Sequence, residues 1–209
     1  MERTQQNEEW FLSRLGKVTG SRFGDVIAMG KNGNFLKSRE TAITEITLEL
    51  LTGQPGPMWT SKATDWGNEQ EPFARMAYET ATGAFVEEVG FIDHPTILQC
   101  GASPDGLIDA DGGFEAKSPY TPAVHMATLL YGMPADHMAQ CQGGMFVTGR
   151  QWWDFVSWHP AFPEGMKLYI QRIERDQKFI DAMEAHIVSA IKEINDNVAR
   201  LLEKYEVVQ

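Results

Sequence analysis

Two carboxylates and one amine occur together in the stretch at residues 101–121, GASPDGLIDADGGFEAKSPYT. Asp105 stands near its start, and Glu115 and Lys117 stand near its end. Carboxylate oxygens are the ligands that a hard cation such as Mg²⁺ prefers, together with water and substrate phosphate. A lysine beside them can orient or deprotonate a water molecule, or stabilise charge on the phosphate. The stretch therefore predicts metal-assisted phosphodiester hydrolysis, although acidic hairpins are more often only solvated turns.

A β-hairpin would bring these side chains together. Residues 103–108 end in apolar side chains, a turn rich in Asp and Gly follows, and residues 114–118 alternate apolar and polar side chains. This pattern is typical of two short antiparallel strands joined by a tight loop. Because alternate residues of a strand share a face, Glu115 and Lys117 should point the same way while their neighbours enter the core. In-register pairing would place Asp105 beside that face.

Length and composition indicate a folded soluble protein. A chain of 209 residues fits one domain, 1–209, and 43% apolar with 22% charged residues is ordinary globular usage. No apolar run is long enough to span a membrane and the polar start is no signal peptide, so we expect a cytoplasmic protein with no membrane partner. Cys100 and Cys141 are far apart and form no Cys-x-x-Cys pair, which favours a reducing compartment.

The charge is unevenly distributed along the chain. A net charge of −11 argues against a broad basic surface that coats nucleic acid. Residues 1–39, however, contain seven basic residues against four acidic ones. Basic character is therefore concentrated where DNA could enter.

The remaining sequence predicts a mixed α/β (α+β) fold. Apolar periodicity and capping residues predict the helices, and short runs of apolar, aromatic and β-branched residues predict the strands. Helices are expected within residues 8–28 (a short one, then a second beginning at 19–21), 38–52, 64–80, 136–146 and 176–204, with either a helix or a loop at 123–131. Strands are expected at 85–92, 151–159 and 168–173, and residues 97–103 lead into the hairpin.

Four further polar groups are candidates for the site. Arg14, followed by Ser21 at a helix start, could form a phosphate-binding pocket, or could be an ordinary surface arginine. Glu71, on the helix at 64–80, could supply a third carboxylate, or be one of many solvated glutamates. Gln140 and Gln142 lie among apolar residues, so each must either make a hydrogen bond in packing or bind a phosphate or water.

Four colinear stretches together resemble the viral recombinase exonucleases, the family that includes the exonuclease of phage lambda. They are EWFLSRLGKVTGS at 9–21, WGNEQEPFARMAYE at 66–79, ASPDGLIDADGGFEAKSPYT at 102–121 and HMAQCQGGMFVTGRQWW at 137–153. The resemblance implies a restriction-endonuclease-like core, with a central mixed sheet flanked by helices and a long C-terminal helix. Residues 29–59 match poorly, so the family's DNA-guiding loop is not carried over.

The same resemblance assigns roles to individual residues. It implies that Mg²⁺ is held by Asp105, Glu115, Glu71 and the backbone carbonyl of Ala116. It implies that Lys117 positions the attacking water, that Gln142 is a catalytic residue close to the active centre, and that Arg14, Ser21 and Ser103 bind the terminal 5′-phosphate.

The implied activity is a Mg²⁺-dependent 5′-to-3′ exonuclease. It would degrade one strand of double-stranded DNA from its ends and leave 3′ single strands for recombination by strand annealing. The resemblance further implies two Mg²⁺ ions, for which Mn²⁺ can substitute, a homotrimeric ring around the DNA, a single-strand annealing protein as partner, and a phage or prophage origin in a bacterial cell. A ring would reconcile the acidity with DNA binding, because only its channel need be positive.

Two other functions fit the same residues. One is an endonuclease that cuts internally or at branched structures. The other is a non-catalytic DNA-end binding partner of an annealing protein. An endonuclease would leave the end-phosphate residues without a purpose, and a catalytically inactive protein would have no need of Asp105, Glu115 and Lys117.

Overall fold

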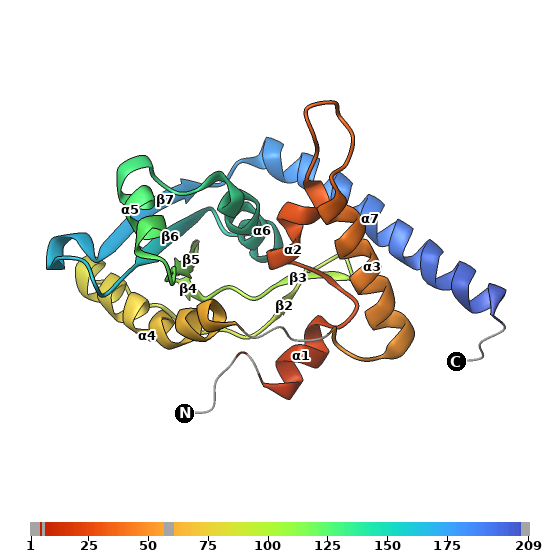
Figure 1. The fold of residues 1–209 in the computed structure, drawn as a ribbon, viewed down its shortest axis with the longest axis horizontal. Helices are drawn as coiled ribbons and strands as arrows, with labels where there is room; N and C mark the ends of the chain where they lie inside the picture. The colour runs from red at the N-terminus through yellow and green to blue at the C-terminus, as the bar shows by residue number, and fades with distance from the viewer. Residues whose placement is uncertain (1–4, 6, 57–60, 206–209) are drawn as a thin grey trace.

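The computed structural model describes Gln5, residues 7–56 and residues 61–205. Arg3, one of the N-terminal basic residues, and residues 57–59 of the poorly matching segment lie outside this part. The fold is mixed α/β with a long C-terminal helix, as expected (Figure 1). The strands form two sheets, of three and four strands, where the sequence suggested one central sheet.

The four-stranded sheet contains the predicted hairpin. Its order is β4 (Gly106–Ile108), β5 (Gly112–Lys117), β6 (Trp152–Trp158) and β7 (Leu168–Glu174). The pair β4 and β5 is antiparallel, β5 and β6 are parallel, and β6 and β7 are antiparallel. Gly113 allows β5 to approach β6 closely, since a Cβ there would lie 2.2 Å from the Trp153 ring. The hairpin and both later strands are therefore confirmed.

The three-stranded sheet connects the N-terminal region to the hairpin. Its order is β1 (Val18–Thr19), β3 (Cys100–Ala102) and β2 (Ile92–Asp93), with β1 parallel and β2 antiparallel to β3. The strand expected at 85–92 is wrong, because that segment makes only an isolated bridge from Glu87 to Leu107 before β2 begins. Its neighbour β4 has only three residues, so it cannot support a longer ladder.

The predicted helices are all present within a few residues. Their ends carry suitable caps: the side chains of Asn7, Ser61 and Asp176 accept N-terminal backbone N–H groups. The helices are α1 (Glu8–Arg14), α2 (Gly20–Ile27), α3 (Lys37–Thr52), α4 (Lys62–Thr82), α5 (Pro122–Tyr131), α6 (Met138–Thr148) and α7 (Gln177–Lys204). Short 3₁₀ turns cover Ala135–His137 and Glu164–Met166.

Two apolar clusters hold these elements together. The larger joins α2, α3, α6 and α7 to β3 and β6, through residues such as Phe23, Ile46, Met145 and Ile187. The smaller packs Tyr78 of α4 and its neighbours against one face of the four-stranded sheet. In Figure 1 this sheet lies between α4 on one side and α5 and α6 on the other. The sheet is thus covered on both faces, and β5, the strand that carries two of the candidate residues, lies in its interior.

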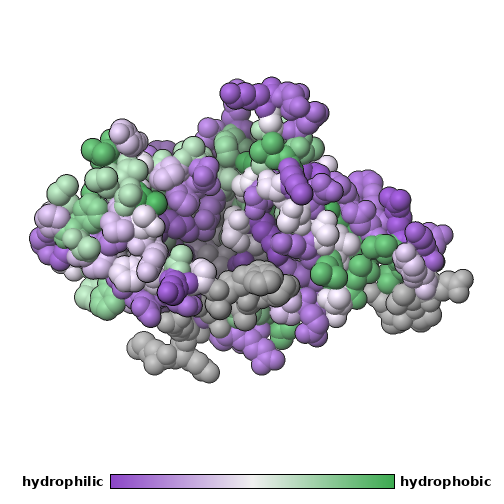
Figure 2. Space-filling model, in the orientation of Figure 1, coloured by the Kyte–Doolittle hydropathy of each residue, from purple (hydrophilic) through white to green (hydrophobic). Residues whose placement is uncertain are grey.

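The visible surface is mostly hydrophilic along α7 and the loop above α2, with apolar residues gathered over α5 (Figure 2). Among the described helices, none combines the length and apolarity needed to cross a membrane.

Candidate active site

The hairpin brings Asp105, Glu115 and Lys117 together as predicted. Gly106 pairs with Phe114, so Asp105 falls opposite the second half of β5. The Ala116 backbone N–H donates to Asp105 Oδ2 at 2.8 Å, and Lys117 Nζ donates to Glu115 Oε1 at 2.5 Å. Glu115 is 2% exposed and the Lys117 side chain is 33% exposed, so the carboxylate is the more deeply buried of the pair.

These groups line a cavity of about 530 Å³ at the meeting point of several elements. Its wall is built from α1, α2, α4, β5 and α6, together with the segment that connects β3 to β4. The lining includes Arg14, Ser21, Glu71, Ser103, Asp105, Glu115, Lys117 and Gln140. Segments far apart in sequence thus contribute to one concave site, which is the usual form of a binding or catalytic site.

Three carboxylates face one another in the cavity, and we call Glu71, Asp105 and Glu115 the carboxylate cluster. Burial and the charge of Asp105 raise the pKa of Glu71 to about 7 and that of Glu115 to about 8. Burial also raises the pKa of Asp105. Burial alone would lower the pKa of Lys117, but the charges of Glu115 and Asp105 outweigh it and raise that pKa. Burial and like charges both favour the protonated form of a carboxyl group, so a cation bound among these groups would stabilise their charged form.

The donor set of the carboxylate cluster suits Mg²⁺. The oxygen donors expected to hold it all line this cavity: the carboxylates of Glu71, Asp105 and Glu115, and Ala116 with its backbone carbonyl. In the part of the chain that the structure describes, no group of three or more His, Cys, Asp or Glu side chains is placed so that it could hold a metal ion. Mg²⁺ does not need one, since it commonly takes one or two carboxylates and completes its shell with water and substrate phosphate.

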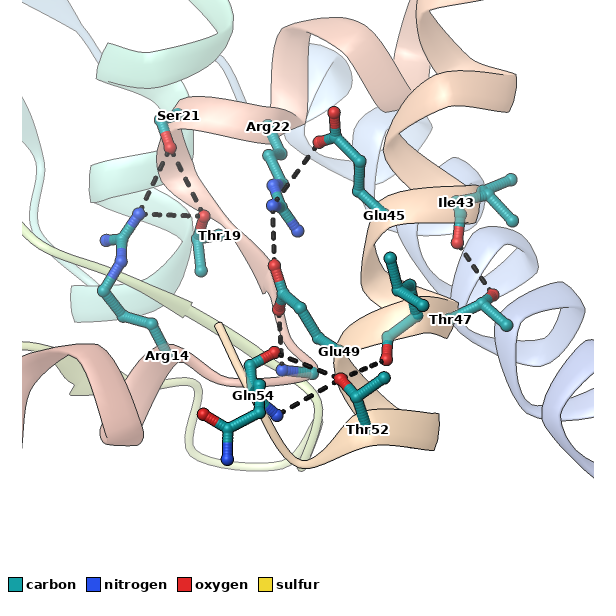
Figure 3. A network of polar contacts seen from close by, with 12 residues as sticks. Arg14, Thr19, Ser21, Arg22, Ile43, Glu45, Thr47, Glu49, Thr52 and Gln54 are labelled. Atoms are coloured by element: carbon teal, nitrogen blue, oxygen red, sulfur yellow. Dashed lines mark hydrogen bonds and ion pairs between the residues drawn. The ribbon is translucent and has the colours of Figure 1, made fainter. Parts of the chain in front are cut away.

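The three residues expected to bind a 5′-phosphate also lie together, and we call Arg14, Ser21 and Ser103 the phosphate pocket. Arg14 Nη1 donates to Ser103 Oγ at 2.9 Å. Its Nη2 donates to Ser21 Oγ at 3.4 Å and to Thr19 Oγ1 at 3.3 Å (Figure 3). The guanidinium lies 4.2 Å from the Trp10 ring centroid, and Trp10 Nε1 donates to Ser103 Oγ at 2.9 Å. A guanidinium beside hydroxyl groups is well suited to a phosphate.

Gln142 does not lie at the carboxylate cluster, so its expected position is wrong. Its Nε2 donates to the Glu174 carbonyl at 2.8 Å, and its Oε1 accepts the Asp176 N–H at 2.9 Å, which ties α6 to the start of α7. Gln140 occupies the cavity instead, where its Nε2 donates to Glu115 Oε1 at 2.5 Å. Residues two apart on a helix do not share a face, so only one of the two glutamines could line the cavity.

Three other residues of the site had no predicted role there. Trp10 forms a wall of the phosphate pocket. Gln5 Nε2 donates to the carbonyls of Pro104 and Val89, at 2.7 and 2.9 Å, beside the cluster. Arg75 lies near enough to Glu71 and Asp105 for its charge to oppose the rise in their pKa values. The sequence did hold a signal for Arg75, because it lies four residues after Glu71 and residues four apart on a helix are neighbours.

Comparison with known proteins agrees with this geometry. Residues 9–151 match the model of the YqaJ-like viral recombinase domain. The chain is similar, at 41% identity, to an alkaline exonuclease (LHK-Exo) from Laribacter hongkongensis; the match covers 96% of this chain and 98% of that one, with a TM-score of 0.88. This chain belongs to the YqaJ-like viral recombinase family. The family resemblance drawn from the four motifs is thus confirmed.

Other members and neighbours extend the comparison. A structure of LHK-Exo in complex with dAMP matches at 39% identity and a TM-score of 0.88, covering 96% of this chain and 98% of that one. A phage related exonuclease from Haemophilus somnus 129PT is 17% identical, with a TM-score of 0.68 over 88% of this chain and 96% of that one, and it supports the fold alone. No curated protein matches the sequence.

Proposed function

We propose that this protein is a metal-dependent exonuclease that digests double-stranded DNA from its 5′ ends. The observation that carries the proposal is that the phosphate pocket and the carboxylate cluster share one cavity. Ser103 of the pocket is separated from Asp105 of the cluster only by Pro104. A terminal phosphate bound by Arg14 would therefore place a phosphodiester of the same strand near the carboxylates, which suits an exonuclease better than an endonuclease.

Each residue of the site has a distinct part in this reaction. Asp105, Glu115, Glu71 and the Ala116 carbonyl would hold Mg²⁺, as one ion or two, with Mn²⁺ as a substitute. When bound, the metal acts as a Lewis acid that withdraws negative charge from the scissile phosphate. Lys117, anchored on Glu115, orients the attacking water. In place of Gln142, Gln140 holds the Glu115 carboxylate in position.

The direction of digestion follows from which end the pocket holds. With the 5′-phosphate on Arg14, Ser21 and Ser103, hydrolysis releases a 5′-mononucleotide and the other strand is left as a 3′ overhang. The related exonuclease has been crystallised with dAMP, a ligand of that size. We further propose that residues 1–209 form a single nuclease domain, that the chain acts in the cytoplasm of a bacterial cell, and that the overhang passes to a single-strand annealing protein.

A homotrimeric ring is part of the same proposal. The net charge of −11 disfavours binding of DNA to the outer surface. A ring with a positive channel would enclose the duplex and keep the acidic surface outside. Light scattering of the purified protein tests this directly, since a mass equal to one subunit would refute the ring.

The test of the activity is digestion of a linear duplex with one 5′-phosphorylated end. Each strand is labelled in turn, and reactions contain Mg²⁺ or EDTA, beside a closed circular duplex. We expect loss of the 5′ label as mononucleotides in Mg²⁺ only, with the circle intact. Cutting of the circle would instead establish an endonuclease, and binding without cutting in either buffer would establish an end-binding protein.

A second substrate tests the phosphate pocket. Wild-type enzyme should digest a 5′-phosphorylated duplex faster than a 5′-hydroxyl duplex, and Arg14→Ala should remove this preference because its guanidinium is the centre of the pocket. An unchanged ratio in Arg14→Ala would overturn the assignment of the pocket.

A further inference from the structure

Glu49, on α3, is a buried carboxylate outside the cavity of the carboxylate cluster, and it lines a second cavity, of about 440 Å³, together with Arg14 and Arg22. Glu49 is 7% exposed. Its Oε2 accepts the Gly16 backbone N–H at 3.0 Å, and its Oε1 accepts an Arg22 Nη2–H at 2.8 Å (Figure 3). One carboxylate from a distant helix therefore holds two donors of the N-terminal region. Hydrogen bonds to a charged partner are about twice as strong as neutral ones.

Each of the two donors lies close in sequence to one residue of the phosphate pocket. Gly16 belongs to the turn that follows Arg14 at the end of α1, and Arg22 directly follows Ser21 in α2. Gly16 has a φ of +68°, and a Cβ there would lie 2.3 Å from Leu50 Cδ2, so the turn packs tightly against α3. Glu49 thus holds the chain close to both Arg14 and Ser21, whose side chains must meet a phosphate.

Glu49 also balances charge near the phosphate pocket. Burial, followed by the nearby charge of Arg22, lowers the pKa of Arg14 to about 10, while the charge of Glu49 acts in the opposite direction. The two guanidinium groups therefore repel each other, and the buried carboxylate offsets this repulsion. Glu45 lies farther from Arg22, at 3.5 Å, and its side chain is 56% exposed, so solvent screens its contribution.

We propose that Glu49 is a positioning residue for 5′-phosphate recognition, which holds Arg14 and Ser21 in place through the Gly16 turn and Arg22 without touching DNA. This inference rests on the proposed end-phosphate pocket. It assigns a specific task to α3, which otherwise serves as scaffold. Loss of the Glu49 carboxylate should weaken discrimination between DNA ends more than it weakens hydrolysis. The hydrogen bonds of Glu49 go to the N-terminal region and not to the carboxylate cluster.

The test compares three variants on duplexes that differ only in a 5′-phosphate or a 5′-hydroxyl. Glu49→Ala removes both hydrogen bonds, Glu49→Gln keeps an acceptor for Gly16 but loses the ion pair with Arg22, and Glu45→Gln is the matched control one turn earlier on α3. We expect the ratio of kcat/KM for the two ends to fall roughly tenfold to a hundredfold in Glu49→Ala, mainly through KM on the phosphorylated end. Glu49→Gln should fall between Glu49→Ala and the wild type, and Glu45→Gln should keep the wild-type ratio.

The outcomes separate this inference from the function on which it rests. A wild-type enzyme that digests both ends equally would refute the phosphate pocket, and Glu49 would lose its task with it. A wild-type preference that survives in both Glu49 variants would overturn the positioning role alone. An equal loss of activity on both ends would also overturn it, since that is what general destabilisation produces. If Glu49→Ala does not fold, Glu49→Gln, which keeps the side-chain volume, decides the question through the same ratio.

Discussion

The two faces of the four-stranded sheet each bury charge, but they treat it differently. On the face toward the cavity, Glu115 of β5 meets Asp105 and Glu71, with Lys117 as its direct partner. On the face toward α4, Asp154 of β6 is 3% exposed, and its carboxylate accepts two hydrogen bonds from Arg172, each of 2.9 Å. The register pairs Phe114 with Asp154 and Glu115 with Phe155, which assigns the two carboxylates to opposite faces.

The difference lies in the partners available to each carboxylate. Asp154 also accepts the Tyr78 hydroxyl at 2.7 Å, and Arg172 stacks 3.6 Å from the centroid of the Trp152 ring, so this charge is fully neutralised within the protein. The carboxylate cluster has three acids but only two nearby cations, Lys117 and Arg75, and burial raises the pKa values of all three acids. Burial of charge alone therefore does not mark a functional site. An excess of one sign is the better indicator, because surplus negative charge attracts a proton or a cation from outside the chain.

The largest effect is expected from a substitution that removes one acid of the carboxylate cluster. Asp105→Asn should lower the rate of DNA hydrolysis at least about a thousandfold, because a central metal ligand is lost. The fold should be kept, since the oxygen of the new carboxamide can still accept the Ala116 N–H and repulsion in the cluster decreases. The measurements are single-turnover digestion and the rise in melting temperature with added Mg²⁺, which should occur in the wild type and disappear in the variant. A variant that keeps the wild-type Mg²⁺ response would remove Asp105 from the metal site.

The lysine on the same face should matter for chemistry but not for holding DNA. Lys117→Ala should reduce hydrolysis about a hundredfold, because the attacking water loses its orienting amine. Binding of a labelled duplex end, measured by gel shift, should remain. Lys192→Ala on α7 is the control, since that amine pairs with the exposed Asp196. Retained hydrolysis in Lys117→Ala would contradict the assigned role.

Local sequence pattern accounts for what could be predicted from the sequence, and tertiary packing accounts for what could not. The hairpin, the shared face of Glu115 and Lys117 and the proximity of Arg14 to Ser21 follow from strand alternation and short separations along the chain, and all are present. The choice between Gln140 and Gln142 depended on how α6 rotates against the sheet. Both glutamines have apolar neighbours, so periodicity could not decide it. Glu49 was not predicted because its partners lie on other elements, far from it in sequence.

The ion pair of Asp154 and Arg172, on the face of the sheet toward α4, should contribute to stability and not to catalysis. Arg172→Met would leave Asp154 buried without its cation, and we expect a loss of about 2 kcal/mol in the free energy of unfolding. Urea denaturation measures this change, and the rate per folded molecule should stay near the wild-type value. A large loss of activity at unchanged stability would contradict the division between the two faces.

The smallest effect should come from the hydroxyl that links α4 to this pair. Tyr78→Phe removes one hydrogen bond to Asp154 but leaves both bonds from Arg172, so we expect about 1 kcal/mol of lost stability. Tyr78 shares α4 with Glu71, which lies on the same helix at the cavity. Pro72 lies between them and cannot donate a backbone hydrogen bond, so the two halves of α4 are less firmly joined than in a regular helix. Digestion rates should therefore remain unchanged in Tyr78→Phe. If digestion rates fall together with stability, α4 moves as one body. The pair of Asp154 and Arg172 on one face of the sheet would then set the position of Glu71 at the cavity on the other face.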